Sequence, residues 1–232
     1  MVSSSARRVA YARTLHSGLA LPRIRGVVFD LDGTMNIPDY TMFTRMRGIL
    51  GISDKQDILK HIDGLEGPDK VAANEAIESI ERSVIDTMSL QPGLLDLLNW
   101  LDRHSVPKAI LTRNNQEPVL HFVNQLLPVA NYKGAFDPVI TRKFKPTKPS
   151  PAPLLHIAKQ WNMHPQEILM VGDGKDDMKC GREAGSVTCF MENKGQESAA
   201  LECEKNGWVD LKIQRISQIK DILEGFDVYR ED

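Results

Sequence analysis

Short apolar runs alternate with longer amphipathic stretches along most of this chain. Four mainly apolar runs have the length of a buried strand, at positions 27–29, 108–112, 168–171 and 187–191. The stretches between them repeat apolar residues at every third or fourth position, which is typical of helices with one buried face. Strands that are apolar on both faces and joined by helices favour a parallel sheet. The pattern predicts an α/β fold, a Rossmann-like parallel sheet core with helices on both faces.

Weaker signals extend this core toward the C-terminus. They predict a short strand at 138–140, an edge strand at Trp208-Val209 and a closing helix at 217–223. We therefore assign the whole of 90–232 to the α/β core, together with the first strand region at 24–36.

The spacing of the strand ends shows where an extra domain fits. Thr34 and Thr112 are 78 positions apart, Thr112 and Lys148 are 36 apart, and Lys148 and Asp173 are 25 apart. A βαβ unit needs about 30 residues. Only the first interval therefore has room for an insertion.

The patterns inside this interval are helical. Apolar residues recur at helical spacing in three stretches, at 42–50, 53–65 and 69–88. Ser53 followed by Gln56 resembles a capping box at the start of the second helix. We predict that 37–89 form a small helical cap above the strand ends.

Charge and cysteine content narrow the class of partner. The 232 residues carry a net charge of −2, so the basic excess that accompanies nucleic-acid binding is missing. Three cysteines without Cys-x-x-Cys spacing indicate neither a disulfide framework nor a zinc site. No apolar run approaches the roughly 18 residues of a membrane span. We expect a monomer or dimer that binds neither nucleic acid nor a membrane.

The N-terminal segment differs in composition from the rest. Positions 1–29 contain five arginines and four serines but no acidic residue. This bias is typical of an organelle transit peptide, and an ordinary basic or disordered tail is the alternative. We expect 1–23 to lie outside the core and the protein to be intracellular. We expect it to be cytoplasmic, or to lie in mitochondria or plastids if this segment is a targeting sequence.

The first strand ends in two acidic residues. Asp30 follows the apolar run directly, Asp32 comes two positions later, and Gly33 allows a tight turn. In open α/β sheets, ligands bind outside the carboxyl ends of the strands. Taken alone, this segment is also compatible with a solvent-facing acidic turn.

Later strand ends add further polar residues at the same edge of the predicted sheet. These residues are Thr112, Lys148, Asp173 and Asp177. Two carboxylates about 4 Å apart repel by about 4 kcal/mol at an effective dielectric constant near 20, so four ionised carboxylates require cations. Oxygen ligands around a phosphate-type substrate favour Mg²⁺, and Lys148 supplies one more positive charge.

In their order and spacing, these residues resemble the motifs of the haloacid dehalogenase-like (HAD) hydrolase superfamily, over about 24–225. The four matching segments are Asp30-Leu31-Asp32-Gly33-Thr34, the strand ending in Thr112, Lys148-Pro149, and Gly172-Asp173 with Asp177. The segment from Gln91 to Thr112 is similar to phosphoglycolate-phosphatase-like members. The resemblance therefore implies a hydrolase of small-molecule phosphate esters.

The resemblance also implies a role for each matching residue. Asp30 would be the nucleophile that becomes an aspartyl phosphate. Asp32 would be the general acid and base. Thr112 and Lys148 would hold the phosphoryl oxygens, with Lys148 also offsetting the charge of Asp30. Mg²⁺ would be bound by Asp30, the backbone carbonyl of Asp32 and Asp173, with Asp177 completing or orienting the shell.

Several alternatives stay open at this point. A phosphoglucomutase-like enzyme would share every motif, and a phosphate-sensing or scaffold protein would keep the fold without turnover. Relatives in the dehalogenase branch lack the acid at the position of Asp32, which favours phosphoryl chemistry here. Arg113 either binds an anionic substrate group or faces solvent. The sequence does not reveal which phosphate ester is hydrolysed.

Overall fold

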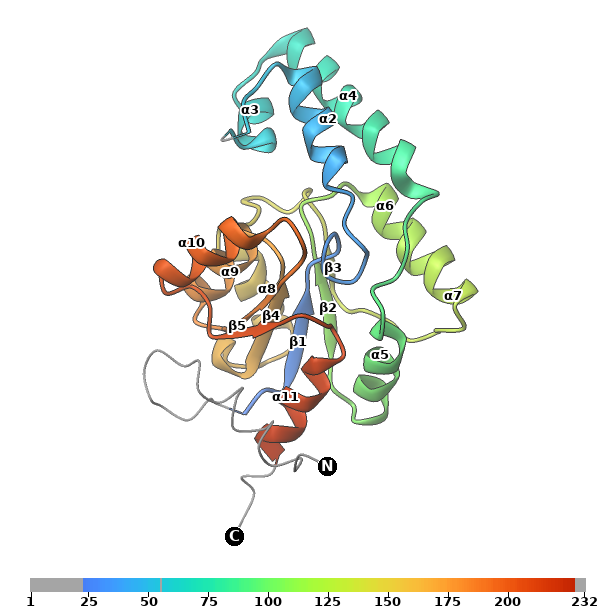
Figure 1. Ribbon diagram of the computed structural model, residues 1–232, viewed down its shortest axis with the longest axis vertical. Helices are drawn as coiled ribbons and strands as arrows, with labels where there is room; N and C mark the ends of the chain where they lie inside the picture. The colour runs from blue at the N-terminus through green and yellow to red at the C-terminus, as the bar shows by residue number, and fades with distance from the viewer. Residues whose placement is uncertain (1–22, 55, 228–232) are drawn as a thin grey trace.

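A parallel sheet forms the centre of the computed structural model, which describes residues 23–54 and 56–227 (Figure 1). Its strand order is β3-β2-β1-β4-β5-β6, and every neighbouring pair is parallel. The six strands are β1 (Gly26–Phe29), β2 (Lys108–Leu111), β3 (Val139–Ile140), β4 (Ile168–Gly172), β5 (Val187–Met191) and β6 (Leu211–Ile213). The predicted α/β fold with a parallel sheet is confirmed.

Strand β1 lies in the middle of the sheet and is buried on both faces. Val28 pairs with Ala109 of β2 on one side and with Met170 of β4 on the other. Val27 and Phe29 belong to the apolar cluster on one face, whereas Val28 belongs to the cluster on the opposite face. Alternating side chains thus serve two cores, which explains why this strand reads as a continuous apolar run.

Helices cover both faces of the sheet, as the amphipathic stretches predict. One face packs against α5 (Leu94–Arg103), α6 (Gln116–His121), α7 (Leu127–Val129) and α11 (Gln218–Asp227). A π-helical turn at Phe122–Leu126 joins α6 to α7. The other face packs against α8 (Ala152–Gln160) and α9 (Lys175–Ala184), with α10 (Glu197–Lys205) beside α9.

Three further helices stand above the carboxyl ends of the strands (Figure 1). They are α2 (Tyr40–Leu50), α3 (Ile58–Asp63) and α4 (Gly67–Ile85), and we call them the helical unit. Their buried residues form an apolar cluster of their own, Met42, Met46, Ile58, Ile62, Ala73, Ile77 and Ile80. The two chain segments that join the helical unit to the sheet pair with each other at Asn36 and Leu90. The domain limits at 36/37 and 89/90 stay a prediction.

Some local predictions are wrong. The expected capping box does not begin α3: Ser53 and Gln56 bond to each other in the preceding turn, and Asp57 caps the helix by accepting from the Lys60 N–H. The edge strand is Leu211–Ile213 instead of Trp208-Val209, because Trp208 and Val209 lie in the turn after α10 and pack against it. The sequence patterns do not predict helix α10.

Two predictions fall partly outside what the structure describes. The candidate targeting segment at 1–23 lies almost wholly in the undescribed N-terminal residues. Within the described part of the chain, none of the helices combines the length and the apolar character of a membrane span.

Candidate active site

The end of β1 places Asp30 beside a buried lysine. The Asp30 N–H donates to the carbonyl of Val171, which continues the sheet bonding by one residue and fixes the backbone. Its carboxylate accepts a hydrogen bond of 2.8 Å from Lys148 Nζ. The Asp30 side chain is 14% exposed, so it faces the opening while its partner is buried.

Lys148 is held between two carboxylates. Its side chain is 2% exposed and contacts Asp177 at 2.5 Å in addition to Asp30. Burial lowers the pKa of Lys148, but Asp177 and Asp30 outweigh this effect and the net shift is upward. Lys148 is therefore a permanent cation at the floor of the site.

Three carboxylates converge on one point. Oxygen atoms of Asp30, Asp173 and Asp177 lie within 4.8 Å of one another. Burial, followed by repulsion from neighbouring carboxylates, raises the pKa of Asp173 to about 8 and that of Asp177 to about 7. A single lysine does not neutralise three acids, so the site has an excess of negative charge. A cluster of hard oxygen donors with this excess fits a divalent cation such as Mg²⁺.

The turn after Asp30 is packed against Asp173. Gly33 has a φ of +76°, and a Cβ atom at this position would lie 1.9 Å from Asp173 Oδ2. Only glycine permits both the left-handed backbone and this close approach. Asn193 joins the same two groups, because its Nδ2 donates to the Gly33 carbonyl at 2.6 Å and to Asp173 Oδ2 at 3.2 Å.

Asp32 occupies a different environment from Asp30. Its carboxylate accepts from Asn36 Nδ2 at 3.0 Å and from Asn114 Nδ2 at 2.6 Å, and the described residues give it no direct ion pair. Burial raises the pKa of Asp32, and repulsion from Asp30 adds to this shift against the opposing effect of the two amides. Asp32 is thus the carboxyl group that is better suited to carry a proton.

The end of β2 supplies Thr112 and Arg113. Thr112 is buried, and its hydroxyl accepts from the Asn114 N–H at 3.2 Å. Arg113 forms ion pairs with Asp176 of α9 and with Asp57, which caps α3 in the helical unit. The Arg113 guanidinium therefore links the core to the helical unit and is not solvent-facing, since the side chain is 24% exposed.

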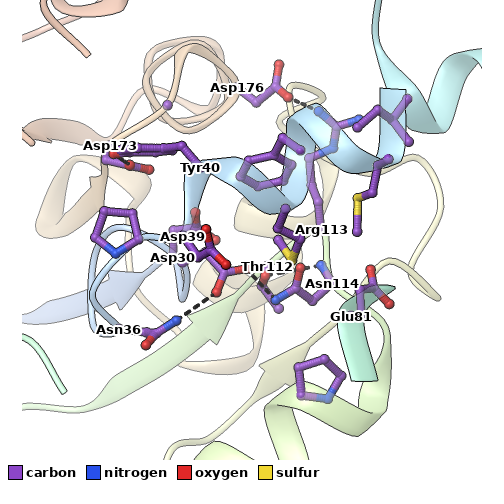
Figure 2. A pocket seen from close by; sticks show the side chains of 18 of the residues that line it. Asp30, Asn36, Asp39, Tyr40, Glu81, Thr112, Arg113, Asn114, Asp173 and Asp176 are labelled. Carbon is purple, nitrogen blue, oxygen red and sulfur yellow. Dashed lines mark hydrogen bonds and ion pairs between the residues drawn. The ribbon is translucent and has the colours of Figure 1, made fainter. Parts of the chain in front are cut away.

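These residues line one cavity of about 540 Å³ between the sheet edge and the helical unit (Figure 2). The structure brings together every predicted site residue, because Asp30, Asp32, Thr112, Arg113, Lys148, Asp173 and Asp177 all line it. The roles assigned to them stay predictions, as does the metal-binding carbonyl of Asp32.

Sequence reasoning missed five polar residues of this region. Asn36, Asn114 and Asn193 hold carboxylates of the site, and Tyr40 of the helical unit donates to Asp173 Oδ2 at 2.7 Å. Glu81 lines the cavity from α4. Asn36 and Asn114 lie within four positions of predicted site residues, so their proximity in sequence was a signal that could have identified them. Tyr40 and Glu81 sit in helical patterns that carry no signal of a site.

Comparison with known proteins agrees with this arrangement. Residues 44–191 match the family model described as haloacid dehalogenase-like hydrolase. An uncharacterized hydrolase of Saccharomyces cerevisiae is 40% identical over 209 residues, covering 89% of this chain and 94% of the relative. A phosphoglycolate phosphatase of Nitrosospira multiformis is 28% identical over 208 residues, covering 78% of this chain and 90% of the relative.

A solved structure shows the same fold. The crystal structure of a HAD hydrolase from Entamoeba histolytica gives a TM-score of 0.67 at 18% identity, covering 88% of this chain and 100% of its own. The family model spans more than half of the chain, and the yeast relative is similar over nearly its whole length. This chain therefore belongs to the haloacid dehalogenase-like hydrolases.

Proposed function

We propose that this protein is a Mg²⁺-dependent phosphatase that hydrolyses a small-molecule phosphomonoester through an aspartyl phosphate on Asp30. The observation that carries the proposal is the contrast between two neighbouring carboxylates. Asp30 is bound by Lys148 and belongs to the acidic cluster, whereas Asp32, among the described residues, accepts from two amides and has a raised pKa. The two groups are thus prepared for nucleophilic attack and for proton transfer, respectively.

Asp30, Asp173 and Asp177, with the backbone carbonyl of Asp32, would hold Mg²⁺. When bound, the ion offsets the charge of the carboxylates and of the phosphoryl group that approaches them. The fit rests on the raised pKa values of Asp173 and Asp177, which fall once a cation balances the cluster.

In the first step, an Asp30 carboxylate oxygen attacks phosphorus while the bond to the leaving-group oxygen breaks. Asp32, protonated at the start, gives its proton to that oxygen, so the product leaves as a neutral alcohol. Lys148 and the Thr112 hydroxyl hold the phosphoryl oxygens. Arg113 is proposed as an additional anion ligand only when its bonds to Asp57 and Asp176 are released.

In the second step, the Asp32 carboxylate takes a proton from a water molecule that attacks the same phosphorus. The bond between phosphorus and the Asp30 oxygen breaks, which releases inorganic phosphate and restores both carboxyl groups. The helical unit covers the cavity and limits the entry of further water.

Phosphate release from p-nitrophenyl phosphate with added Mg²⁺ tests this proposal. We expect turnover in the wild type, none after chelation with EDTA, and none in Asp30→Asn. Asp54 lines the same cavity but is exposed, so Asp54→Asn is a matched control that keeps activity. Product analysis with a sugar phosphate separates hydrolysis from phosphoglucomutase-like transfer, since release of free phosphate supports the hydrolase. Undiminished turnover in Asp30→Asn would refute the assigned nucleophile.

A further inference from the structure

A buried carboxylate of the helical unit has one oxygen without a partner. Glu81 of α4 has a side chain that is 4% exposed, and its Oε1 accepts from Arg142 Nη1. Its Oε2 is buried and has no hydrogen-bond partner among the described residues. Glu81 lines the cavity, so its side chain borders the space that a substrate would fill.

Burial of a carboxylate without enough donors is costly. Burial raises the pKa of Glu81 to about 7, and the attraction of Arg142 only partly offsets this shift. A ligand that donates a hydrogen bond to Oε2 would satisfy the remaining oxygen. The ionised form of Glu81 therefore lacks a donor at Oε2, and a ligand in the cavity could supply one.

Glu81 is linked to the proton-carrying group through Arg142 and Asn114. Arg142, which holds Glu81, donates its backbone N–H to the carbonyl of Asn114 at 2.9 Å. The Asn114 side chain in turn donates to Asp32 at 2.6 Å. Figure 2 shows Glu81 on the far side of Asn114 from Asp30. Asp32 and Glu81 line the same cavity, so a leaving group that receives a proton from Asp32 can extend toward Glu81.

Four of the five cations that line the cavity form ion pairs with acidic side chains. Arg113 pairs with Asp57 and Asp176, Arg142 with Glu78 and Glu81, Lys148 with Asp30 and Asp177, and Lys175 with Glu202. Arg47 has no acidic partner among the described residues, and its Nε donates to the Gln56 carbonyl. A carboxylate on the leaving group would thus meet the acid Glu81 in a lining where four of the five cations, all except Arg47, are already paired with acids.

We propose that Glu81 is a specificity-determining residue that selects phosphomonoesters whose leaving group carries a hydroxyl or ammonium donor and disfavours leaving groups with a carboxylate. This inference rests on the proposed phosphatase function and adds its substrate class. It predicts that 2-phosphoglycolate, whose leaving group carries a carboxylate, is a poor substrate of this protein.

Four esters of nearly equal size test the preference. They are 2-hydroxyethyl phosphate, phosphoethanolamine, propyl phosphate and 2-phosphoglycolate. We expect kcat/KM of the wild type to be about tenfold or more higher for the better of the two donor esters than for propyl phosphate, and lowest for 2-phosphoglycolate. The donor ester with the higher kcat/KM shows whether the site prefers a hydroxyl or an ammonium group. A wild type that prefers 2-phosphoglycolate, or that treats all four alike, would overturn the inference.

Substitution of Glu81 assigns the preference to this residue. In Glu81→Gln we expect kcat/KM for the preferred donor ester to fall about tenfold while that for propyl phosphate changes less than twofold. Glu78→Gln is the matched control, because Glu78 also accepts from Arg142, at 3.3 Å, but is 39% exposed and lies outside the lining. We expect it to leave the ratio between esters unchanged. An equal loss for all four esters in Glu81→Gln would show a structural role and overturn the inference.

The two proposals fail in different ways. Absence of p-nitrophenyl phosphate hydrolysis by the folded, Mg²⁺-supplemented wild type would overturn the phosphatase function, and the inference about Glu81 with it. Hydrolysis of p-nitrophenyl phosphate without the expected order among the four esters would overturn the inference alone. The wild-type order requires no variant, so a failure of Glu81→Gln to fold does not prevent the test.

Discussion

The sheet edge and the helical unit border the same cavity with different chemistry. The sheet edge contributes the acidic cluster, which is fixed by strand ends and the first turn of α9, and Lys148 from the loop before α8. The helical unit contributes mainly apolar side chains such as Met42 and Ile77, together with Glu81. In the proposed function, the groups that act on phosphorus thus lie at the edge of the sheet, whereas those that would meet the leaving group lie on helices with a separate core. We therefore expect the sheet edge to determine the type of reaction and the helical unit to determine the choice of substrate.

The strongest test of this assignment is the nucleophile. Asp30→Asn removes the attacking oxygen and should lower kcat by roughly 10³-fold or more, since loss of a nucleophile removes the covalent route. Phosphate release measures the loss, and thermal unfolding checks that the fold is kept. The loss should be similar for every ester, in contrast to Glu81→Gln.

Replacement of the acid separates the two chemical steps. Asp32→Asn should lower kcat by about 10²–10⁴-fold for an alkyl phosphate, whose leaving group needs a proton. The loss in the first step should be much smaller with p-nitrophenyl phosphate, because nitrophenolate leaves without one. A rapid burst of about one equivalent of nitrophenol, followed by slow turnover, is the expected signature. Equal losses in the rate of the first step for both esters would contradict the acid role.

The acidic cluster predicts how pH affects the metal-free protein. Asp173 and Asp177 have folded pKa values of about 8 and 7, above the ordinary value of 3.8. The folded state therefore binds more protons than the unfolded state between about pH 4 and 8, and its stability should fall as pH rises through this window. Added Mg²⁺ should raise the melting temperature more at pH 8 than at pH 5.

A variant of the cluster checks the origin of this effect. Asp173→Asn removes one of the repelling charges and should stabilise the metal-free protein at pH 8 by roughly 1–3 kcal/mol, about one or two pKa units of interaction. The same variant should lose most of the stabilisation by Mg²⁺. Urea unfolding with EDTA or with Mg²⁺ measures both quantities. A metal-free variant less stable than the wild type at pH 8 would contradict the account.

The smallest effect concerns the connection between the two regions. Arg113 and Asp57 are about one-quarter exposed, and an ion pair of this kind contributes up to about 1 kcal/mol. We expect Arg113→Gln and Asp57→Asn to raise KM by a similar factor of about three to five, because either change frees the helical unit. If Arg113 binds substrate instead, only Arg113→Gln would raise KM. The exposed pair of Lys145 and Asp63 is the control, and Asp63→Asn should leave KM unchanged.

Much of the core was predictable because its signals are local. Buried strands appear as apolar runs, and the residues that end them are adjacent in sequence to those runs, so Asp30, Thr112 and Asp173 could be placed at one edge. The exceptions are instructive. Helix α10 has only small buried residues, Ala199, Ala200 and Cys203, and so lacks a strong apolar stripe. The last strand is three residues long and too short to stand out against its neighbours.

The sequence by itself determined the α/β fold, the order of the motifs and the predicted residues of the candidate site, since each depends on residue type and spacing along the chain. Only the tertiary structure decided that Lys148 is also paired with Asp177, that Arg113 is bound by two acids, and that Glu81 lines the cavity with one oxygen unsatisfied. These properties arise from contacts between segments far apart in sequence. Burial and neighbouring charge are set by those contacts, and no local pattern records them.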